Sequence, residues 1–372
     1  MKNILIAIRS IFKKGRHNVM KIVSLGIGLA VGLVLIAKVY FEQSYDDFYP
    51  DRDRVYQVWA KYQQNGGELK DYPQTSGGIA PTMQQQIPEI ETVTRYTSFG
   101  DWTFTMTDTK MKYSGRCIIA DSCFFDILPR PMLIGNAKEV LSIPMYVLVS
   151  SRIAKNIGGD VIGKNFTVDS SPGRTMTIGG VFEEVPENSH SRYDVIVSMA
   201  SAGRFMWEGS PTNMLGNDRY ISYVKLHKGV NPLALEEQVH TFVNSYFPPE
   251  EQQKTGFNIG FSFHELDGLH KELPQVKRMT WILSLLAFAL IFTAVMNYIL
   301  IVISSIVNRS KEVAVHKCYG ASENNIHGMM FGEALVHIVL SLILALLLIL
   351  AFRGTVEELL ATSLDSLLLS NG

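Results

Sequence analysis

The chain has 372 residues, 47% of them hydrophobic, and a formal net charge of −1. A nearly neutral chain gives no support for a nucleic-acid partner or a strongly acidic substrate. The three cysteines, Cys117, Cys123 and Cys318, form no CxxC pair, which argues against a metal site and a disulfide framework. Cys117 and Cys123 lie six residues apart, so a bridge stays open, although two buried thiols are the commoner arrangement.

Residues 1–41 predict a membrane anchor. In residues 1–18, Ile and Leu alternate with Lys and Arg at helical spacing, which is typical of an amphipathic helix on a membrane surface. Residues 19–41 are apolar over a length that spans a bilayer, and the aromatic residues at their end favour an uncut anchor over a cleavable signal peptide. Basic residues precede this span and acidic residues come after it, so we expect the N-terminus in the cytoplasm.

Gly28 and Gly32 stand four residues apart within this first span. A pair of small residues at this spacing lets a neighbouring helix approach closely, so both glycines are candidate helix-packing positions. Glycine is also frequent in membrane helices, and the spacing alone leaves both explanations open.

Residues 42–277 have an ordinary globular composition and predict a large extracytoplasmic α+β domain, whose size permits two lobes. Short β-type runs bounded by turn residues recur along it, at residues 54–59, 103–106, 146–149, 175–181 and 220–226. Helical patterns lie near residues 80–86, 151–156 and 233–246.

This segment offers no persuasive catalytic constellation, because GxSxG and HExxH motifs are absent. The adjacent acids Asp46 and Asp47, and likewise Glu183 and Glu184, point apart in regular structure and are expected to be solvated. His190 is expected to be a turn residue. We therefore expect the chain not to be an enzyme.

Residues 158–165 have the GxxxxGK spacing of a phosphate-binding loop. Asn165 stands where such a loop has the Ser or Thr that holds magnesium, and the next residues are strand-like instead of helical. A surface turn explains this stretch better than a nucleotide site.

Residues 278–306 and 328–352 are the second and third apolar spans. Asn297 lies near the middle of the second, and its amide is expected to pack against other helices instead of lipid. Glu333 and His337 lie four residues apart on the third span and share one face. A proton site is conceivable there, but a pair turned toward protein is the better-supported expectation.

The loop between these spans, residues 307–327, is basic and is expected in the cytoplasm. The tail, residues 353–372, is then expected outside. It is too short and too charged to form another span.

Several stretches resemble the permease subunits of ABC transporters of the MacB/FtsX type, especially those of Bacteroidetes. They are residues 4–10, 44–56, 120–128, 181–190 and 308–322. The last of these, NRSKEVAVHKCYGAS, is the most specific, because it is similar to the family's RxKEhxhxKxxGAS loop. The match covers nearly the whole chain.

The resemblance implies a permease subunit of an export or mechanotransmission complex in the bacterial inner membrane. ATP and magnesium would be bound by a partner ATPase, and this chain would hold no cofactor, metal or catalytic residue. Two permease chains, identical or different, would pair in the membrane lipid, and a periplasmic adaptor is a further candidate partner. The loop helix would dock into the ATPase through the coupling residues Arg309, Lys311, Glu312, Val313, Lys317, Gly320, Ala321 and Ser322.

The resemblance leaves two matters open. The family also contains FtsX-like regulators that transport nothing and control a periplasmic hydrolase or lipoprotein partner, and this is the alternative function. The family has four spans in each permease unit, whereas three are predicted here.

Overall fold

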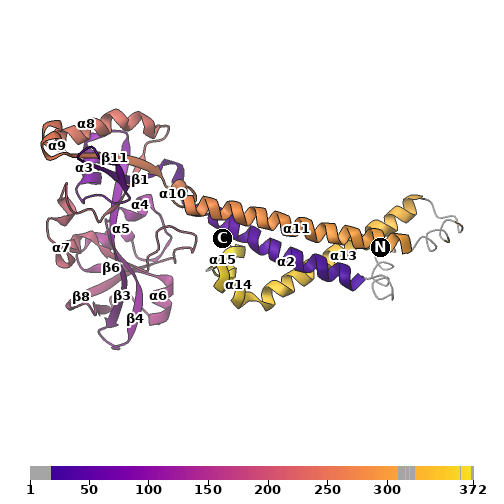
Figure 1. Ribbon diagram of the computed structural model, residues 1–372. Helices are drawn as coiled ribbons and strands as arrows, with labels where there is room; N and C mark the ends of the chain where they lie inside the picture. The colour runs from indigo at the N-terminus through magenta and orange to yellow at the C-terminus, as the bar shows by residue number, and fades with distance from the viewer. Residues whose placement is uncertain (1–17, 309–314, 316–317, 319–322, 361, 370–372) are drawn as a thin grey trace. The chain divides into compact units, whose positions relative to one another are not determined.

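The computed structural model describes residues 18–308, 315, 318, 323–360 and 362–369 (Figure 1). The chain divides into two compact units. We call Tyr45–His270 the sheet domain, and the described parts of Met1–Ser44 and Lys271–Gly372 the helix bundle.

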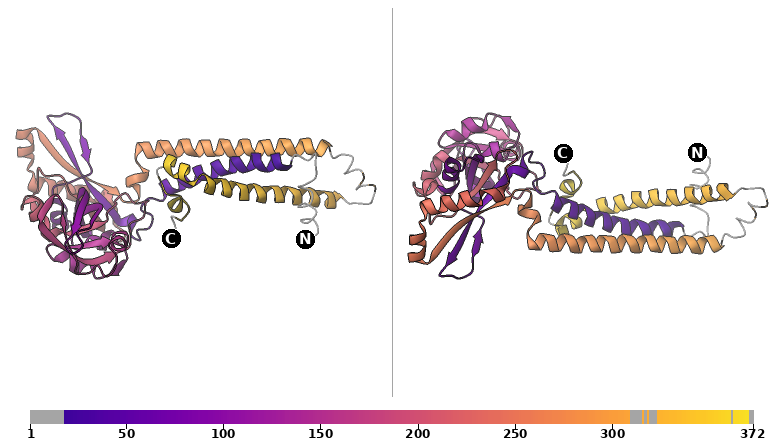
Figure 2. Two further views of the ribbon diagram at one scale, coloured as in Figure 1. Left: turned by 90° about the horizontal axis from the view of Figure 1, so that it is seen from below. Right: turned by 90° about the horizontal axis from the view of Figure 1, so that it is seen from above.

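Three long helices make up most of the helix bundle: α2 (Asn18–Gln43), α11 (Pro274–Asn308) and α13 (Glu323–Ala351). Each contains a stretch that is long and apolar enough to cross a membrane, and each contains one of the three predicted apolar spans. Helix α2 packs along both α11 and α13 and lies between them in the two views of Figure 2.

Two short helices come after α13, namely α14 (Arg353–Leu360) and α15 (Leu364–Leu369). Arg353 pairs with Glu357 one turn along α14 and with Asp365 at the start of α15, which ties the two helices together. Helix α15 packs against α2. The segment that the sequence predicts as a plain tail is therefore folded against the bundle.

The sheet domain is built on one mixed sheet of eleven strands. The order along the sheet is β11-β1-β10-β3-β4-β9-β6-β8-β5, with β2 paired to β1, and β7 paired to β3 and β8. The β4–β9 and β6–β8 pairs are parallel and the others are antiparallel. The strands are β1 (Val55–Gln64), β2 (Lys70–Tyr72), β3 (Ile90–Met106), β4 (Lys112–Ala120), β5 (Met132–Ile134), β6 (Tyr146–Ser150), β7 (Asn165–Val168), β8 (Ser171–Phe182), β9 (Val195–Ser198), β10 (Ile221–Leu226) and β11 (Phe257–Glu265).

Strand β3 joins the two ends of this sheet because it is long enough to have different partners along its length. Its first part, up to Tyr96, pairs with β10, the part from Tyr96 onward pairs with β4, and its last three residues also pair with β7. In that later part Trp102, Phe104 and Met106 are buried while Asp101 and Thr103 are exposed, as the two-residue period of a strand with one core-facing side requires.

Short helices cover the sheet. They are α3 (Ile79–Gln86), α4 (Phe124–Ile127), α5 (Ala137–Ser142), α6 (Ser151–Ile157), α7 (Ala202–Phe205), α8 (Glu236–Tyr246), α9 (Pro249–Thr255) and α10 (Gly268–Lys271), with 3-10 turns η1 (Arg52–Arg54), η2 (Met199–Ser201), η3 (Ser210–Thr212) and η4 (Pro232–Leu235). Local sequence sets their ends. Ser150 caps α6 by accepting from the Ile153 amide, and α9 ends at Gly256, whose φ of 64° is left-handed.

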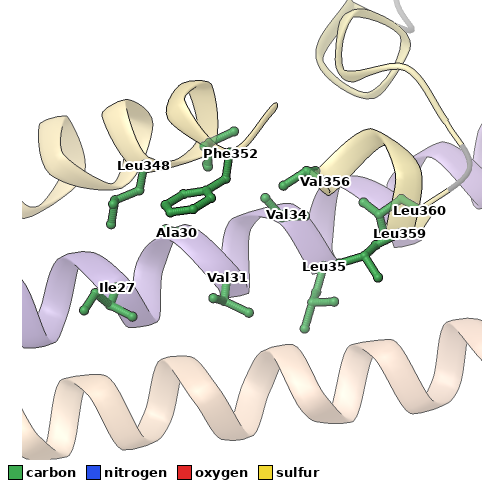
Figure 3. Close-up of a pocket in the computed structure, with 11 residues that line it drawn as sticks. Ile27, Ala30, Val31, Val34, Leu35, Leu348, Phe352, Val356, Leu359 and Leu360 are labelled. Atoms are coloured by element: carbon green, nitrogen blue, oxygen red, sulfur yellow. The ribbon is translucent and has the colours of Figure 1, made fainter. Parts of the chain in front are cut away.

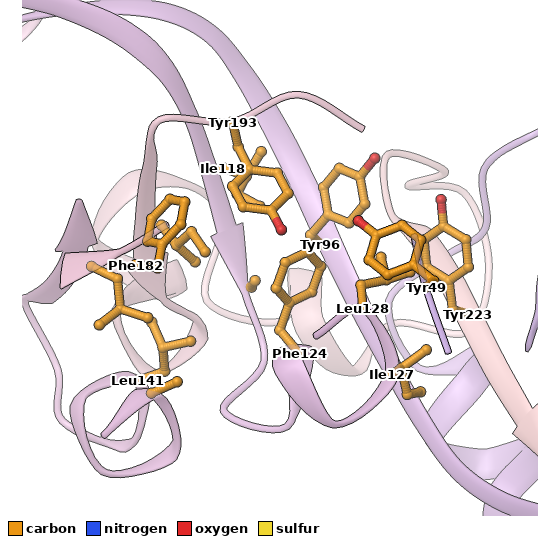
Figure 4. Close-up of a cluster of buried hydrophobic side chains, with 14 of the residues drawn as sticks. Tyr49, Tyr96, Ile118, Phe124, Ile127, Leu128, Leu141, Phe182, Tyr193 and Tyr223 are labelled. Atoms are coloured by element: carbon orange, nitrogen blue, oxygen red, sulfur yellow. The ribbon is translucent and has the colours of Figure 1, made fainter. Parts of the chain in front are cut away.

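The core of the sheet domain consists of three clusters of buried side chains. One of them, which we call the aromatic cluster, gathers Tyr49, Tyr96, Phe124, Tyr193 and Tyr223 from strands, loops and α4 (Figure 4). The other two lie around β7 and β8, and beneath α3 and α8. Burial of this apolar area is the main force that holds the domain together.

The five predicted β runs are confirmed, since they lie in β1, β3, β6, β8 and β10, and the three helical patterns correspond to α3, α6 and η4–α8. The prediction left two lobes open, whereas one continuous sheet and one compact unit are found. Residues 158–165, which have the spacing of a phosphate-binding loop, form the turn between α6 and the start of β7, as predicted. Cys117 and Cys123 are both free thiols, the first buried and the second half-buried.

Candidate functional site

The predicted coupling residues, Arg309 to Ser322, lie outside the described residues. The structure does describe the helices on either side, α11 up to Asn308 and α13 from Glu323. Any motion of this loop must enter the bundle through these two helices. The packing of α11 and α13 therefore connects the loop to the rest of the bundle.

Helix α2 presents glycines to both neighbours. A Cβ atom placed on Gly28 would lie 2.2 Å from the Cβ of Ala294 in α11, and one placed on Gly32 would lie 2.4 Å from Cγ1 of Ile291. On the other side, Gly26 lies against α13, where an added Cβ would come within 2.9 Å of Leu344. The two predicted packing positions thus lie where α2 and α11 approach closely.

The predicted packing role of Asn297 is not met within this chain. Its side chain is exposed, whereas Ala294, three residues earlier on α11, is buried against α2. A polar residue in an apolar span indicates only that it avoids lipid. It does not indicate which neighbour it faces.

Buried polar side chains gather near the start of α2 and in the first half of α13. Lys21 is 2% exposed, Glu333 7% and His337 1%, and Asn18 is also buried. The pair Glu333 and His337 therefore faces protein, as expected from the sequence. Tyr298 of α11 reaches the same place, with its hydroxyl 3.4 Å from Nδ1 of His337. We call these five residues the polar cluster.

An apolar groove of about 490 Å³ runs between α2, α13 and α14 (Figure 3). Its walls are aliphatic or aromatic throughout, and they include Val31, Phe352 and Leu359. Beyond it, Lys38 of α2 is buried, donates to Oγ1 of Thr362 at 2.8 Å and pairs with Glu42 at 2.7 Å. This pairing fastens the segment between α14 and α15 to α2.

The sheet domain contains a second buried polar network, which the sequence did not reveal. Asp46 is fully buried and has a φ of 60°, a left-handed conformation that Asp tolerates better than most residues. Its carboxylate lies 2.7 Å from Nδ1 of His190 and accepts from the hydroxyl of Ser189 at 3.0 Å. Its own amide donates to the carbonyl of Asn188. Asp46 therefore fastens the start of the domain to the 188–190 turn.

This network continues into the aromatic cluster. Nε2 of His190 lies 2.9 Å from the hydroxyl of Ser191, which lies 2.8 Å from the hydroxyl of Tyr96. Tyr223 also bonds to the His190 ring. Burial raises the pKa of Tyr96 to about 12 and raises the pKa of Tyr223 well above its ordinary value, so both phenols are neutral at physiological pH.

The expectation that Asp46 is solvated was wrong, because Asp46 is buried, unlike the exposed Asp47 next to it. His190 lies in a turn region, as expected, and it is also a member of the buried network. Asp46 and His190 lie 144 residues apart, and no local pattern indicates that they are partners. In the described residues no group of three or more His, Cys, Asp or Glu side chains could hold a metal ion.

A folded α+β domain inserted between apolar, span-length helices defines the class of this protein as a membrane protein with a large domain outside the membrane. A family model described as the MacB-like periplasmic core domain matches residues 20–242. A second, described as the FtsX-like permease C-terminal, matches residues 284–370. The chain belongs to this family of MacB/FtsX-like ABC permeases.

The chain is also similar to solved structures. A crystal structure described as a domain of a permease protein from Porphyromonas gingivalis is 32% identical, with a TM-score of 0.53, over 58% of this chain and 91% of that one. The periplasmic region of MacB from Actinobacillus actinomycetemcomitans is 14% identical, with a TM-score of 0.40, over 59% of this chain and 92% of that one. The extracellular domain of the ABC-type transporter YknZ from Gram-positive bacteria is 10% identical, with a TM-score of 0.39, over 55% and 98%. Among curated proteins, none matches the chain.

Membership implies an inner-membrane protein with a periplasmic domain, an ATPase partner and a dimeric assembly. ABC permeases are generally the non-enzymatic membrane component of their complexes.

Proposed function

We propose that this chain is a permease subunit that couples ATP hydrolysis in a partner ATPase to movement of its own periplasmic domain, in an export or mechanotransmission complex. One observation carries the proposal. A single chain has a periplasmic core domain and a permease module, and the loop with the family's coupling pattern joins α11 to α13. The chain itself supplies no cofactor, and ATP with magnesium belongs to the ATPase.

The proposed topology is derived from charge. Basic residues before α2 and in the loop 307–327 support a cytoplasmic N-terminus and a cytoplasmic loop, and the acidic residues after α2 support a periplasmic sheet domain. Lipid surrounds the bundle, and a second permease chain, identical or different, completes the membrane part. A periplasmic adaptor is a further partner compatible with this arrangement.

The test uses the permease purified with its ATPase in lipid nanodiscs, since the substrate is unidentified. Hydrogen–deuterium exchange of residues 45–270 is compared with and without ATP. We expect an ATP-dependent difference in the wild type. Glu312→Lys and Gly320→Trp should reduce that difference to background, because the first reverses the charge at position 312 and the second puts a bulky side chain at a glycine of the proposed docking sequence.

Glu358→Lys is the matched control, because it makes the same charge change on the exposed face of α14, away from the loop. It should leave the ATP-dependent difference intact. Should the wild type show no such difference while the ATPase is bound and hydrolysing ATP, coupling to the sheet domain is refuted. An unchanged ATP-dependent difference in Glu312→Lys would show that the loop has no coupling role.

A further inference from the structure

The two helices that flank the coupling loop pack on different neighbouring faces of α2. Ala294 of α11 lies against Gly28, whereas Ser341 and Leu344 of α13 lie against Gly26. In Figure 2, α2 lies between α11 and α13. A displacement of the loop would therefore act on both α11 and α13, and these two helices are connected mainly by their packing on α2.

A direct side-chain link between α11 and α13 lies in the polar cluster. The hydroxyl of Tyr298 is 3.4 Å from Nδ1 of His337, a long hydrogen bond, and the two rings meet edge to face with centroids 6.2 Å apart. At about 1.5 Å per residue, Tyr298 lies roughly 15 Å from the end of α11 and His337 roughly 21 Å from the start of α13. The link thus joins both helices within a few turns of the loop.

Other buried polar residues lie within about one helical turn of this link. Ser341 donates to the carbonyl of Ile22 at 3.1 Å, and Leu344 lies against Gly26, so α2 and α13 run in the same direction. One turn back from these contacts, Asn18 of α2 comes level with His337, whereas Lys21 lies beside the Ser341 level and Glu333 one turn before His337. A lysine, a glutamate and a histidine that are almost fully buried in an apolar bundle are costly, and such residues are retained where they serve a function.

We propose that Tyr298 and His337 are positioning residues for the coupling step. Their contact keeps α11 and α13 in register, so that the loop moves both helices together. In the tautomer that carries its proton on Nε2, the imidazole accepts the Tyr298 hydroxyl at Nδ1, and the nearly complete burial of His337 holds the ring in place. This inference rests on the proposed function, because it concerns the route by which the loop reaches the sheet domain.

The experiment uses the same nanodisc complex and the same ATP-dependent exchange difference. Tyr298→Phe and His337→Leu each remove one half of the link and should reduce the difference by roughly two- to tenfold, the range that the loss of one hydrogen bond allows. The double variant should be no worse than either single variant, because both remove the same contact. His337→Gln, whose amide oxygen accepts a hydrogen bond, should restore most of the difference.

Thr293→Val is the control on the same helix, since the Thr293 hydroxyl is exposed and bonds only along α11 to the Ala289 carbonyl. It should behave as wild type. If the reductions of the ATP-dependent difference add up in the double variant, or if His337→Gln does not restore it, the inference is overturned. Tyr298 and His337 would then have only a general packing role. Failure of the wild type to respond to ATP would instead overturn the proposed function, and the two failures are therefore distinguishable.

Discussion

Asp46 shows how one residue can fix the entry of a chain into a domain. It lies only three residues after the end of α2, yet its carboxylate is inside the protein and contacts Ser189 and His190. The neighbouring Asp47 is exposed. Two chemically identical residues thus form a matched pair, one buried and bonded, the other on the surface.

We predict that Asp46→Asn destabilises the 188–190 turn by about 2 kcal/mol, since a buried hydrogen bond to a charged group is worth roughly 1.5–3 kcal/mol. Hydrogen exchange of the peptide that contains Ser189 and His190 in the full chain should speed up by about thirtyfold. Asp47→Asn should leave that exchange unchanged. Equal rates in the two variants would show that Asp46 contributes no more than a surface carboxylate.

Sequence reasoning failed at this residue for a physical reason. Burial of a carboxylate requires partners, and those partners lie on a turn 144 residues away. Asp46 and Asp47 have the same local sequence context, so only the tertiary fold distinguishes them. The polar pair Glu333 and His337 could be predicted to face protein, because both lie on one helix and their spacing defines a face.

At the scale of elements, predictability depended on whether a local period was present. The membrane helices have long apolar stretches, and β3 and β8 contain residues of high strand propensity, so both kinds of element were predicted. The pairing of β4 with β9, and of β6 with β8, joins strands far apart in the sequence. Single strands carry no information on such partners. The folding of α15 onto α2 was missed because it depends on contacts with a helix far away in the sequence.

The glycines of α2 lead to a prediction about helix packing. Gly28→Ala should destabilise the bundle by about 1–3 kcal/mol, because the new Cβ meets the Ala294 Cβ at 2.2 Å and the two helices must separate. Gly332→Ala is the control within α13, where an added Cβ has no neighbour within 4 Å. Both changes raise helix propensity alike, so only the contact differs.

Thermal unfolding of the detergent-solubilised chain, followed by circular dichroism at 222 nm, measures this difference. The Gly28→Ala variant should melt several degrees below wild type, and the Gly332→Ala variant at or above it. Equal melting temperatures would mean that α2 and α11 do not depend on close approach at Gly28.

On the scale of the whole molecule, the sheet domain has the features of an independent folding unit. It has its own sheet and three core clusters, and its two ends come together, since the ring of Tyr45 stacks on that of His270 at 3.4 Å between centroids. Arg52 near the start also pairs with Asp267 near the end at 3.2 Å. An insertion whose ends meet can leave and re-enter a helix bundle without disturbing its own core.

We therefore predict that residues 45–270, expressed alone, fold into a soluble α+β domain with cooperative thermal unfolding, as suits a unit with its own core. The crystallised domain from the Porphyromonas gingivalis permease, which matches 58% of this chain, makes the experiment practical.

A shorter fragment, residues 55–270, is the informative control. It keeps every strand but lacks Asp46, Tyr49 and Arg52, so His190 loses its carboxylate and the aromatic cluster loses a ring. We expect the shorter fragment to unfold at a temperature at least 10 °C lower, since several buried contacts are lost together and each kcal/mol shifts the midpoint of a domain this size by about 2–4 °C. Equal stability of the two fragments would show that the segment after α2 is a tether, whereas the predicted loss would make it part of the folded domain.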